Sequence, residues 1–245
     1  MHRPVFMRAL AGLTLATGLM APAPQAHAVA DCATDAMLVF DGSGSMNEFG
    51  YDPSERTRIQ EAREAVSRAM PQIAPVRRIG LVIYGPGEAS CDGIDLRFGP
   101  RVDAAGPVID AVNALRPGGL TPLANSVQAA AEALDYRNEA GIVVLVTDGN
   151  ETCGGRPCSL GAALAAEARD LTVHVIGFRT VVDYWTWDNP EQEVFAGDDS
   201  VARCLADRTG GMYVSTRTVD ELSAALQDTL GCALIGAREQ DLRAG

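Results

Sequence analysis

Residues 37–48 of the chain read MLVFDGSGSMNE. The apolar run that ends at Phe40 indicates a buried strand. It stops at an aspartate and continues in small residues, so that Asp41, Ser43 and Ser45 carry oxygen atoms at alternate positions. A carboxylate and two hydroxyls directly after a core strand are ligands that a hard divalent cation prefers. A phosphate loop, a nucleophile turn and an ordinary solvated turn are the alternatives.

Most of the following sequence alternates apolar runs with helical patterns. Candidate strands cover residues 36–40, 79–84, 94–98, 142–146, 173–178 and 212–215, and candidate helices cover residues 56–70, 104–115, 122–134, 159–170, 201–209 and 219–230. This alternation predicts an α/β fold with a doubly wound, mostly parallel six-stranded sheet and helices on both faces. Only a loop joins the second strand to the third, so we expect the third to be an antiparallel edge strand. Ligands of such sheets bind beyond the carboxyl ends of the strands. We call this edge of the sheet, with its loops, the functional rim, and the DGSGS turn lies on it.

The first thirty residues are typical of a secretory signal peptide. Arg3 and Arg8 supply the positive start, residues 9–20 supply the apolar centre, and small residues at 26–30 offer a cleavage site. The expected organisation is a signal peptide over residues 1–30, one α/β domain over residues 31–235 and a polar tail over residues 236–245. After the signal we expect no transmembrane segment. These features predict a periplasmic or secreted protein.

The six cysteines all follow the signal, and an even number in an exported chain favours disulfides over a thiolate metal site. Cys32 and Cys232 should be neighbours, because the last helix descends to the end of the sheet where the first strand begins. The other four lie on rim loops or helix starts. We favour Cys91–Cys153 with Cys158–Cys204, because the two helices of the second pair should begin side by side. Cys153–Cys158 with Cys91–Cys204 remains the alternative.

The chain is acidic, with a formal net charge of −12, and it contains no lysine. Binding to nucleic acid is driven by neutralisation of phosphates, so an acidic chain without a basic patch argues against a nucleic-acid partner. The charge is compatible with a site that collects divalent cations.

Two more oxygen-bearing turns accompany the first. In GIVVLVTDGN, Asp148 follows an apolar run as Asp41 does, and in GGLTPL, Thr121 precedes a proline. If the three turns lie side by side, two carboxylates and three hydroxyls surround one point. Mg²⁺ suits this set, since it takes six oxygen ligands and accepts water for some of them. Because the two carboxylates repel each other without a cation, replacing either should cost little stability.

With these residues the sequence resembles the von Willebrand factor type A domain family over essentially the whole mature chain. The metal-ion-dependent adhesion site of that family has the pattern D-x-S-x-S, a distant threonine and an aspartate in a TDG-type turn. The five positions are filled here, in order, by Asp41, Ser43, Ser45, Thr121 and Asp148. The stretches DGNETCGGRPC and VHVIGF look like those of exported bacterial members.

The resemblance implies a binding module rather than an enzyme. The three hydroxyls would ligate Mg²⁺, with Mn²⁺ or Ca²⁺ as substitutes, and the two aspartates would hold the cation partly through water. An open coordination position would accept an Asp or Glu carboxylate from a partner protein. We expect the module itself to be a monomer.

Structural roles compete with these assignments. Thr121 before a proline is also a normal helix N-cap. Asn150 and Glu151 are either groups that support the metal ligands or solvated loop. His174 lies in an apolar strand pattern and is expected to be a sheet histidine rather than a ligand.

Enzyme motifs fit poorly. His174 is the only histidine after the signal, so a rim-located Ser-His-Asp or Cys-His mechanism has no candidate base. GSGSM does not match the nucleophile elbow, and a phosphate loop needs a lysine. The dinucleotide motif fails at Asn47, where its last glycine would be, and Ser43 replaces the second acid of an aspartate-nucleophile phosphotransferase. Metal-assisted hydrolysis is the alternative function.

The segment 179–200 is long for a connection between a strand and a helix. It contains Tyr184, Trp185 and Trp187, residue types that anchor protein interfaces, and we expect them to bind the partner. The alternative is that the aromatics cover the core. One of the acids of this segment, Asp183, Asp188, Glu191 or Glu193, could occupy the open metal position and make the segment a gate.

Overall fold

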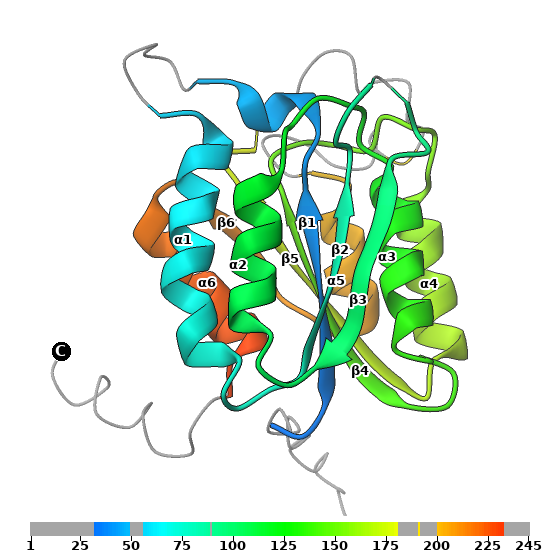
Figure 1. Cartoon of the computed structure of the whole chain (residues 1–245). Helices are drawn as coiled ribbons and strands as arrows, with labels where there is room; N and C mark the ends of the chain where they lie inside the picture. Colours follow the sequence, from blue (N-terminus) through cyan, green and yellow to red (C-terminus); the bar gives the residue numbers. More distant parts are fainter. Residues whose placement is uncertain (1–31, 50–55, 89, 181–190, 192–199, 233–245) are drawn as a thin grey trace, which may run out of the picture.

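The computed structural model describes residues 32–49, 56–88, 90–180, 191 and 200–232. In this part of the chain a six-stranded sheet is covered by helices on both faces (Figure 1). The strand order is β3-β2-β1-β4-β5-β6, and only the β2–β3 pair is antiparallel. This confirms the predicted fold class, including the antiparallel edge strand.

The strands are β1 (Asp35–Asp41), β2 (Ile79–Tyr84), β3 (Ile94–Arg101), β4 (Ala140–Thr147), β5 (Asp170–Phe178) and β6 (Tyr213–Thr216). The central strands β1, β2 and β4 are buried along almost their whole length. Strands that are covered on both faces read as continuous apolar runs, which is why these three were recognisable in the sequence.

The helices are η1 (Gly44–Asn47), a 3₁₀ turn, followed by α1 (Arg58–Ile73), α2 (Ala105–Ala114), α3 (Leu123–Ala133), α4 (Pro157–Glu167), α5 (Arg203–Thr209) and α6 (Val219–Leu230). One face of the sheet packs against α1, α2 and α6, and the other packs against α3, α4 and α5 (Figure 1). Alternate residues of β1 serve the two cores: Leu38 and Phe40 face the first, and Met37 and Val39 face the second.

The C-terminal ends of two predicted helices were wrong, and two strands are longer than predicted: β3 ends at Arg101 instead of residue 98, and β5 begins at Asp170 instead of residue 173. Helix α1 continues through Pro71 to Ile73 instead of ending at residue 70. Pro71 cannot donate the usual i→i−4 hydrogen bond, but continuation of the helix buries Ile73. The predicted helix over residues 159–170 ends at Glu167, because Asp170 already pairs with Ala140 in the sheet.

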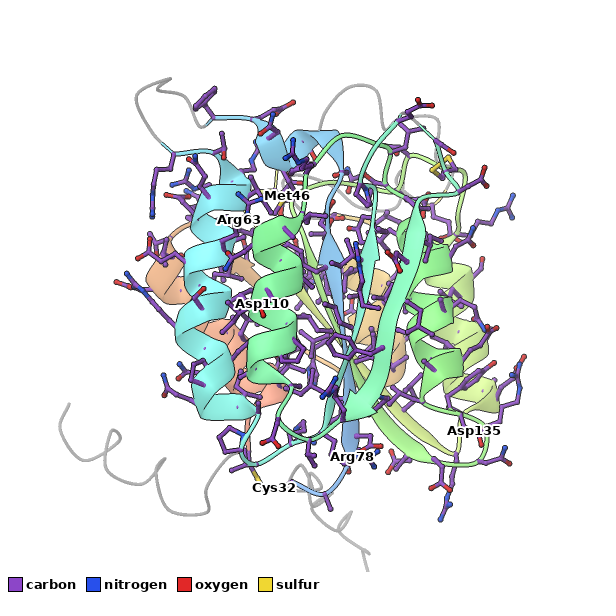
Figure 2. The ribbon with its side chains drawn as sticks, viewed as in Figure 1. Cys32, Met46, Arg63, Arg78, Asp110 and Asp135 are labelled. Carbon is purple, nitrogen blue, oxygen red and sulfur yellow. A yellow bond between two sulfur atoms is a disulfide. The ribbon has the colours of Figure 1, made fainter. Side chains whose placement is uncertain are left out.

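Three disulfides join Cys32 to Cys232, Cys91 to Cys153 and Cys158 to Cys204. These are the pairs that the sequence favoured. Cys32 lies at the end of the molecule opposite Met46, which follows the DGSGS turn (Figure 2). The rim with its loops therefore lies at one end of the molecule, and the Cys32–Cys232 disulfide lies at the opposite end. None of the described helices has the length and apolar character needed to cross a membrane.

Candidate metal-binding site

The central strands bring the two aspartates together. In the register of β1 and β4, Phe40 pairs with Val146, so that Asp41 and the Thr147–Asp148 step lie side by side where both strands end. The β1–β4 pair is also the point where the strand order reverses, the usual ligand position in an open α/β sheet.

The carboxylate of Asp41 is completely buried and held on both oxygens. Oδ1 accepts a hydrogen bond of 2.8 Å from the backbone N–H of Ser43. Oδ2 accepts from the hydroxyls of Tyr84 and Thr147, each at 2.8 Å. The three donors fix the orientation of Asp41 at the base of the rim.

A chain of hydroxyls connects this turn to the second aspartate. The Oγ atoms of Ser43 and Ser45 are 3.0 Å apart, and Ser45 Oγ donates to Asp148 Oδ1 at 2.7 Å. Because Ser45 gives its proton to Asp148, Ser43 is the donor in the bond between the two serines, and one lone pair of Ser45 Oγ is left for another partner. A cation beside Ser45 would therefore meet this lone pair without disturbing the bond to Asp148.

Close backbone packing places the GGLTPL turn, which contains Gly119 and Thr121, beside the DGSGS turn. Ser43 forms a β-bridge with Gly119, and the N–H of Gly44 donates to the carbonyl of Gly119 at 2.9 Å. A Cβ atom on Gly119 would lie 2.7 Å from the carbonyl oxygens of Gly85 and Glu88, so a side chain cannot be accommodated there. The glycine allows Thr121, two residues on, to line the same pocket as the serines.

Thr121 is not the N-cap of α3, and its side chain is therefore not used for capping. The cap position is Pro122, which makes no side-chain cap bond. Instead Glu151, buried to 2% exposure, accepts from the backbone N–H of Ala124 in the first turn at 2.9 Å, and from the N–H of Cys153 at 2.7 Å. The expectation that Thr121 also serves as the cap was wrong, because Glu151 performs the capping from the neighbouring loop.

The three turns enclose a pocket of about 180 Å³. Ser43, Ser45, Thr121 and Asp148 line it, while Asp41 lies buried behind them. The described residues contain no group of three or more His, Cys, Asp or Glu side chains placed to hold a metal. A cation here would depend on the hydroxyls. Hydroxyls and carboxylates without nitrogen or sulfur suit Mg²⁺, Mn²⁺ or Ca²⁺, so the donor set fits the implied ion.

Electrostatics distinguish the two aspartates. Burial, and then the neighbouring charge of Asp41, raise the pKa of Asp148 to about 8, although the hydrogen bond from Ser45 and the positive charge of Arg58 oppose this. Arg58 Nη1 is 3.3 Å from Asp148 Oδ2 and forms a buried ion pair with it. Negative charge in this pocket is therefore unfavourable unless a cation accompanies it.

Sequence reasoning missed Tyr84, Thr147 and Arg58, and it left the role of Glu151 open. Tyr84 and Thr147 carry a weak signal, because each places a hydroxyl at the end of an otherwise apolar strand. Arg58 carried no such sequence signal, since an arginine at the start of a helix is normally expected on the surface. His174 behaves as expected: its Nδ1 accepts from the N–H of Met212 at 3.0 Å.

The aromatic residues predicted to bind the partner, Tyr184, Trp185 and Trp187, lie outside the described residues, as do Asp183, Asp188 and Glu193. Glu191 is described, and its carboxylate accepts from the N–H groups of Cys158 and Ser159, at 2.7 and 3.1 Å, where α4 begins. Of the four candidate gate acids, Glu191 is thus bound to the positive end of a helix rather than to the metal pocket.

Two curated proteins of Bacillus subtilis are similar to this chain in sequence. The uncharacterized protein YwmD of Bacillus subtilis is 28% identical over 221 residues, which cover 86% of this chain and 90% of YwmD. YwmC of the same organism is 27% identical over 174 residues, covering 66% of this chain and 74% of YwmC.

Solved structures share the fold. A von Willebrand factor type A protein from Catenulispora acidiphila superposes with a TM-score of 0.57 at 17% identity, over 81% of this chain and 42% of that one. Proximal thread matrix protein 1 from the mussel byssus, with a zinc-occupied MIDAS motif, superposes with a TM-score of 0.56 at 20% identity, over 83% of this chain and 46% of that one. The family model of the von Willebrand factor type A domain matches residues 36–151, so this part of the chain is similar to that family.

Proposed function

We propose that this chain is an exported, metal-ion-dependent protein-binding module. Domains of the family that it resembles are commonly protein-interaction modules. One divalent cation, Mg²⁺ by default, would be held by the hydroxyls of Ser43, Ser45 and Thr121, and by Asp41 and Asp148 partly through water. The bound cation would supply an electrophilic centre for a carboxylate of a partner protein.

The hydrogen bond from Ser45 Oγ to Asp148 Oδ1 is the observation that carries this proposal. It commits the proton of Ser45 to Asp148 and leaves a lone pair for a cation in the pocket that Ser45 shares with Ser43 and Thr121. A purely structural serine would need no second hydroxyl at 3.0 Å and no threonine facing the same space. Few direct anionic ligands leave the cation able to gain from an incoming Asp or Glu.

Two further features support export. The residues before the domain have the pattern of a signal peptide, and three disulfides stabilise proteins of oxidising compartments. We propose cleavage near residue 30, a binding domain up to residue 235 and a polar tail after it. Tyr184, Trp185 and Trp187 remain the proposed partner-binding residues.

Partner capture tests the function. The mature chain is immobilised and exposed to an exported-protein extract in Mg²⁺, then in excess chelator, with Thr121→Val as a matched variant of similar size. Capture that requires both Mg²⁺ and the Thr121 hydroxyl supports the proposal. Capture that persists in the chelator and in the variant contradicts it.

Metal-assisted hydrolysis remains the alternative function, and substrate turnover that disappears in Asp148→Asn would establish it instead.

A further inference from the structure

Arg58 is a buried cation inside the candidate metal site. It is the first residue of α1, it is 5% exposed, and it lines the same pocket as the proposed ligands. Nη1 approaches three acceptors: the carbonyl of Ser45 at 2.9 Å, Glu48 Oε2 at 3.0 Å and Asp148 Oδ2 at 3.3 Å. One of the two site aspartates is therefore paired with an arginine.

This position is unfavourable for an arginine on structural grounds. The N-terminus of a helix carries the positive end of the backbone dipole, which favours acidic side chains. Nε of Arg58 is buried and has no hydrogen-bond partner among the described residues, which adds a desolvation cost. The helix dipole therefore does not favour a guanidinium here, and Arg58 lines a pocket that we propose to bind a ligand.

The charges of the site suggest what Arg58 does. Asp41 and Asp148 together balance one divalent cation, and Arg58 adds a positive charge that the aspartates do not balance. Glu48 also contacts Arg58, but its side chain is 60% exposed, so water screens it. Arg58 and Asp148 are the charged side chains that line the pocket, and Asp41 lies behind them, so with the cation bound this group would carry excess positive charge.

We propose that Arg58 makes the metal-loaded site an anion receptor: it lowers the affinity for the divalent cation and raises the affinity of the loaded site for a carboxylate. This inference rests on the proposed function. Arg58 repels the incoming cation and competes with it for Asp148. Once the cation is bound, the same guanidinium attracts a carboxylate and can donate hydrogen bonds to it.

Arg58→Met tests the proposal because it keeps the length of the side chain and removes the charge. Mn²⁺ binding is measured by titration, and acetate binding is measured from the fall in water-proton relaxation of the Mn²⁺-loaded protein. We expect Arg58→Met to bind Mn²⁺ about tenfold more tightly and acetate at least about tenfold more weakly than the unaltered chain. Arg58→Lys, which keeps the charge, should lie closer to the unaltered chain in both measurements.

Arg68→Met is the matched control, because it removes one positive charge from the same helix at an exposed position that pairs with Glu64 and Asp220. It should change neither affinity. A loss of both affinities in Arg58→Met would indicate a merely structural role and overturn the inference, as would unchanged affinities. If Arg58→Met does not fold, Arg58→Lys decides: the inference is overturned if that variant binds both Mn²⁺ and acetate more weakly. If the unaltered chain binds no Mn²⁺, the proposed function itself fails.

Discussion

The hydroxyl of Tyr84 donates a hydrogen bond of 2.8 Å to Oδ2 of Asp41, at the ends of the adjacent strands β2 and β1. Thr147 donates to the same oxygen from β4, on the other side. Asp41 is therefore a structural acceptor for three elements as well as a proposed metal ligand. For Asp41, this revises the expectation that its removal would cost little stability.

Asp41→Ala should lower the free energy of unfolding by about 2–4 kcal/mol, because it leaves the buried Tyr84 and Thr147 hydroxyls without their acceptor. Tyr84→Phe should cost only about 1 kcal/mol and retain cation binding. Urea unfolding in excess chelator measures both changes. Equal stability of Asp41→Ala and the unaltered chain would show that these hydrogen bonds contribute nothing.

Asp148→Asn should separate cation binding from stability. The raised pKa of Asp148 means that the folded, metal-free protein holds a proton that the unfolded chain releases, so this residue's contribution to stability falls as pH rises from about 4 to about 8. The amide cannot ionise, so at pH 8 and without metal the variant should be at least as stable as the unaltered chain. Mg²⁺ should raise the melting temperature of the unaltered chain alone. A less stable variant at pH 8 would contradict the raised pKa.

Glu151→Ala should weaken both α3 and the metal site. Loss of the acceptor for Ala124 leaves a helix N-terminus uncapped, at a cost of about 1–2 kcal/mol. Since Glu151 also bonds to Cys153 in the loop that follows Asp148, we expect weaker Mg²⁺ binding as well. Glu132→Ala, an exposed change later in the same helix, is the control for titration calorimetry and urea unfolding. Unchanged Mg²⁺ affinity in Glu151→Ala would restrict this residue to capping.

His174 should make the protein less stable in acid. Burial, with a further contribution from the charge of Arg77, lowers the pKa of His174 to about 4. The unfolded chain takes up the proton near pH 6.5, so stability falls as pH decreases from about 6.5 to about 4. Protonation would also prevent Nδ1 from accepting the N–H of Met212. When melting temperatures are measured across this pH range, the melting temperature of His174→Gln should decrease less than that of the unaltered chain. Equal decreases in the two proteins would exclude a role for the histidine.

The sequence was most informative where one local pattern determines one structural feature. The runs ending at Phe40 and Val146 are apolar because both faces of a central parallel strand are buried, so the strands and the aspartates that follow them could be placed. At Gly119 a glycine is required because a Cβ atom would lie 2.7 Å from two carbonyl oxygens, and a glycine in a loop is the local sign of such a close approach.

Long-range partners could not be read from the sequence. The Glu151 bond to Ala124 and the Arg58 pair with Asp148 each join residues far apart in the chain, and no local spacing predicts them. Helix ends were missed for a similar reason. Burial of Ile73 and sheet pairing of Asp170 are tertiary effects that override local helix signals.

Titration calorimetry of the mature chain with Mg²⁺, repeated with Ser45→Ala, tests the central claim most directly. The unaltered chain should bind one Mg²⁺ per molecule in chelator-reversible fashion, and Ser45→Ala should lose that binding while it keeps the fold, checked by circular dichroism. Absence of saturable binding of Mg²⁺, Mn²⁺ and Ca²⁺ by the unaltered chain, or unchanged affinity in Ser45→Ala, would contradict the claim that these turns form a metal site.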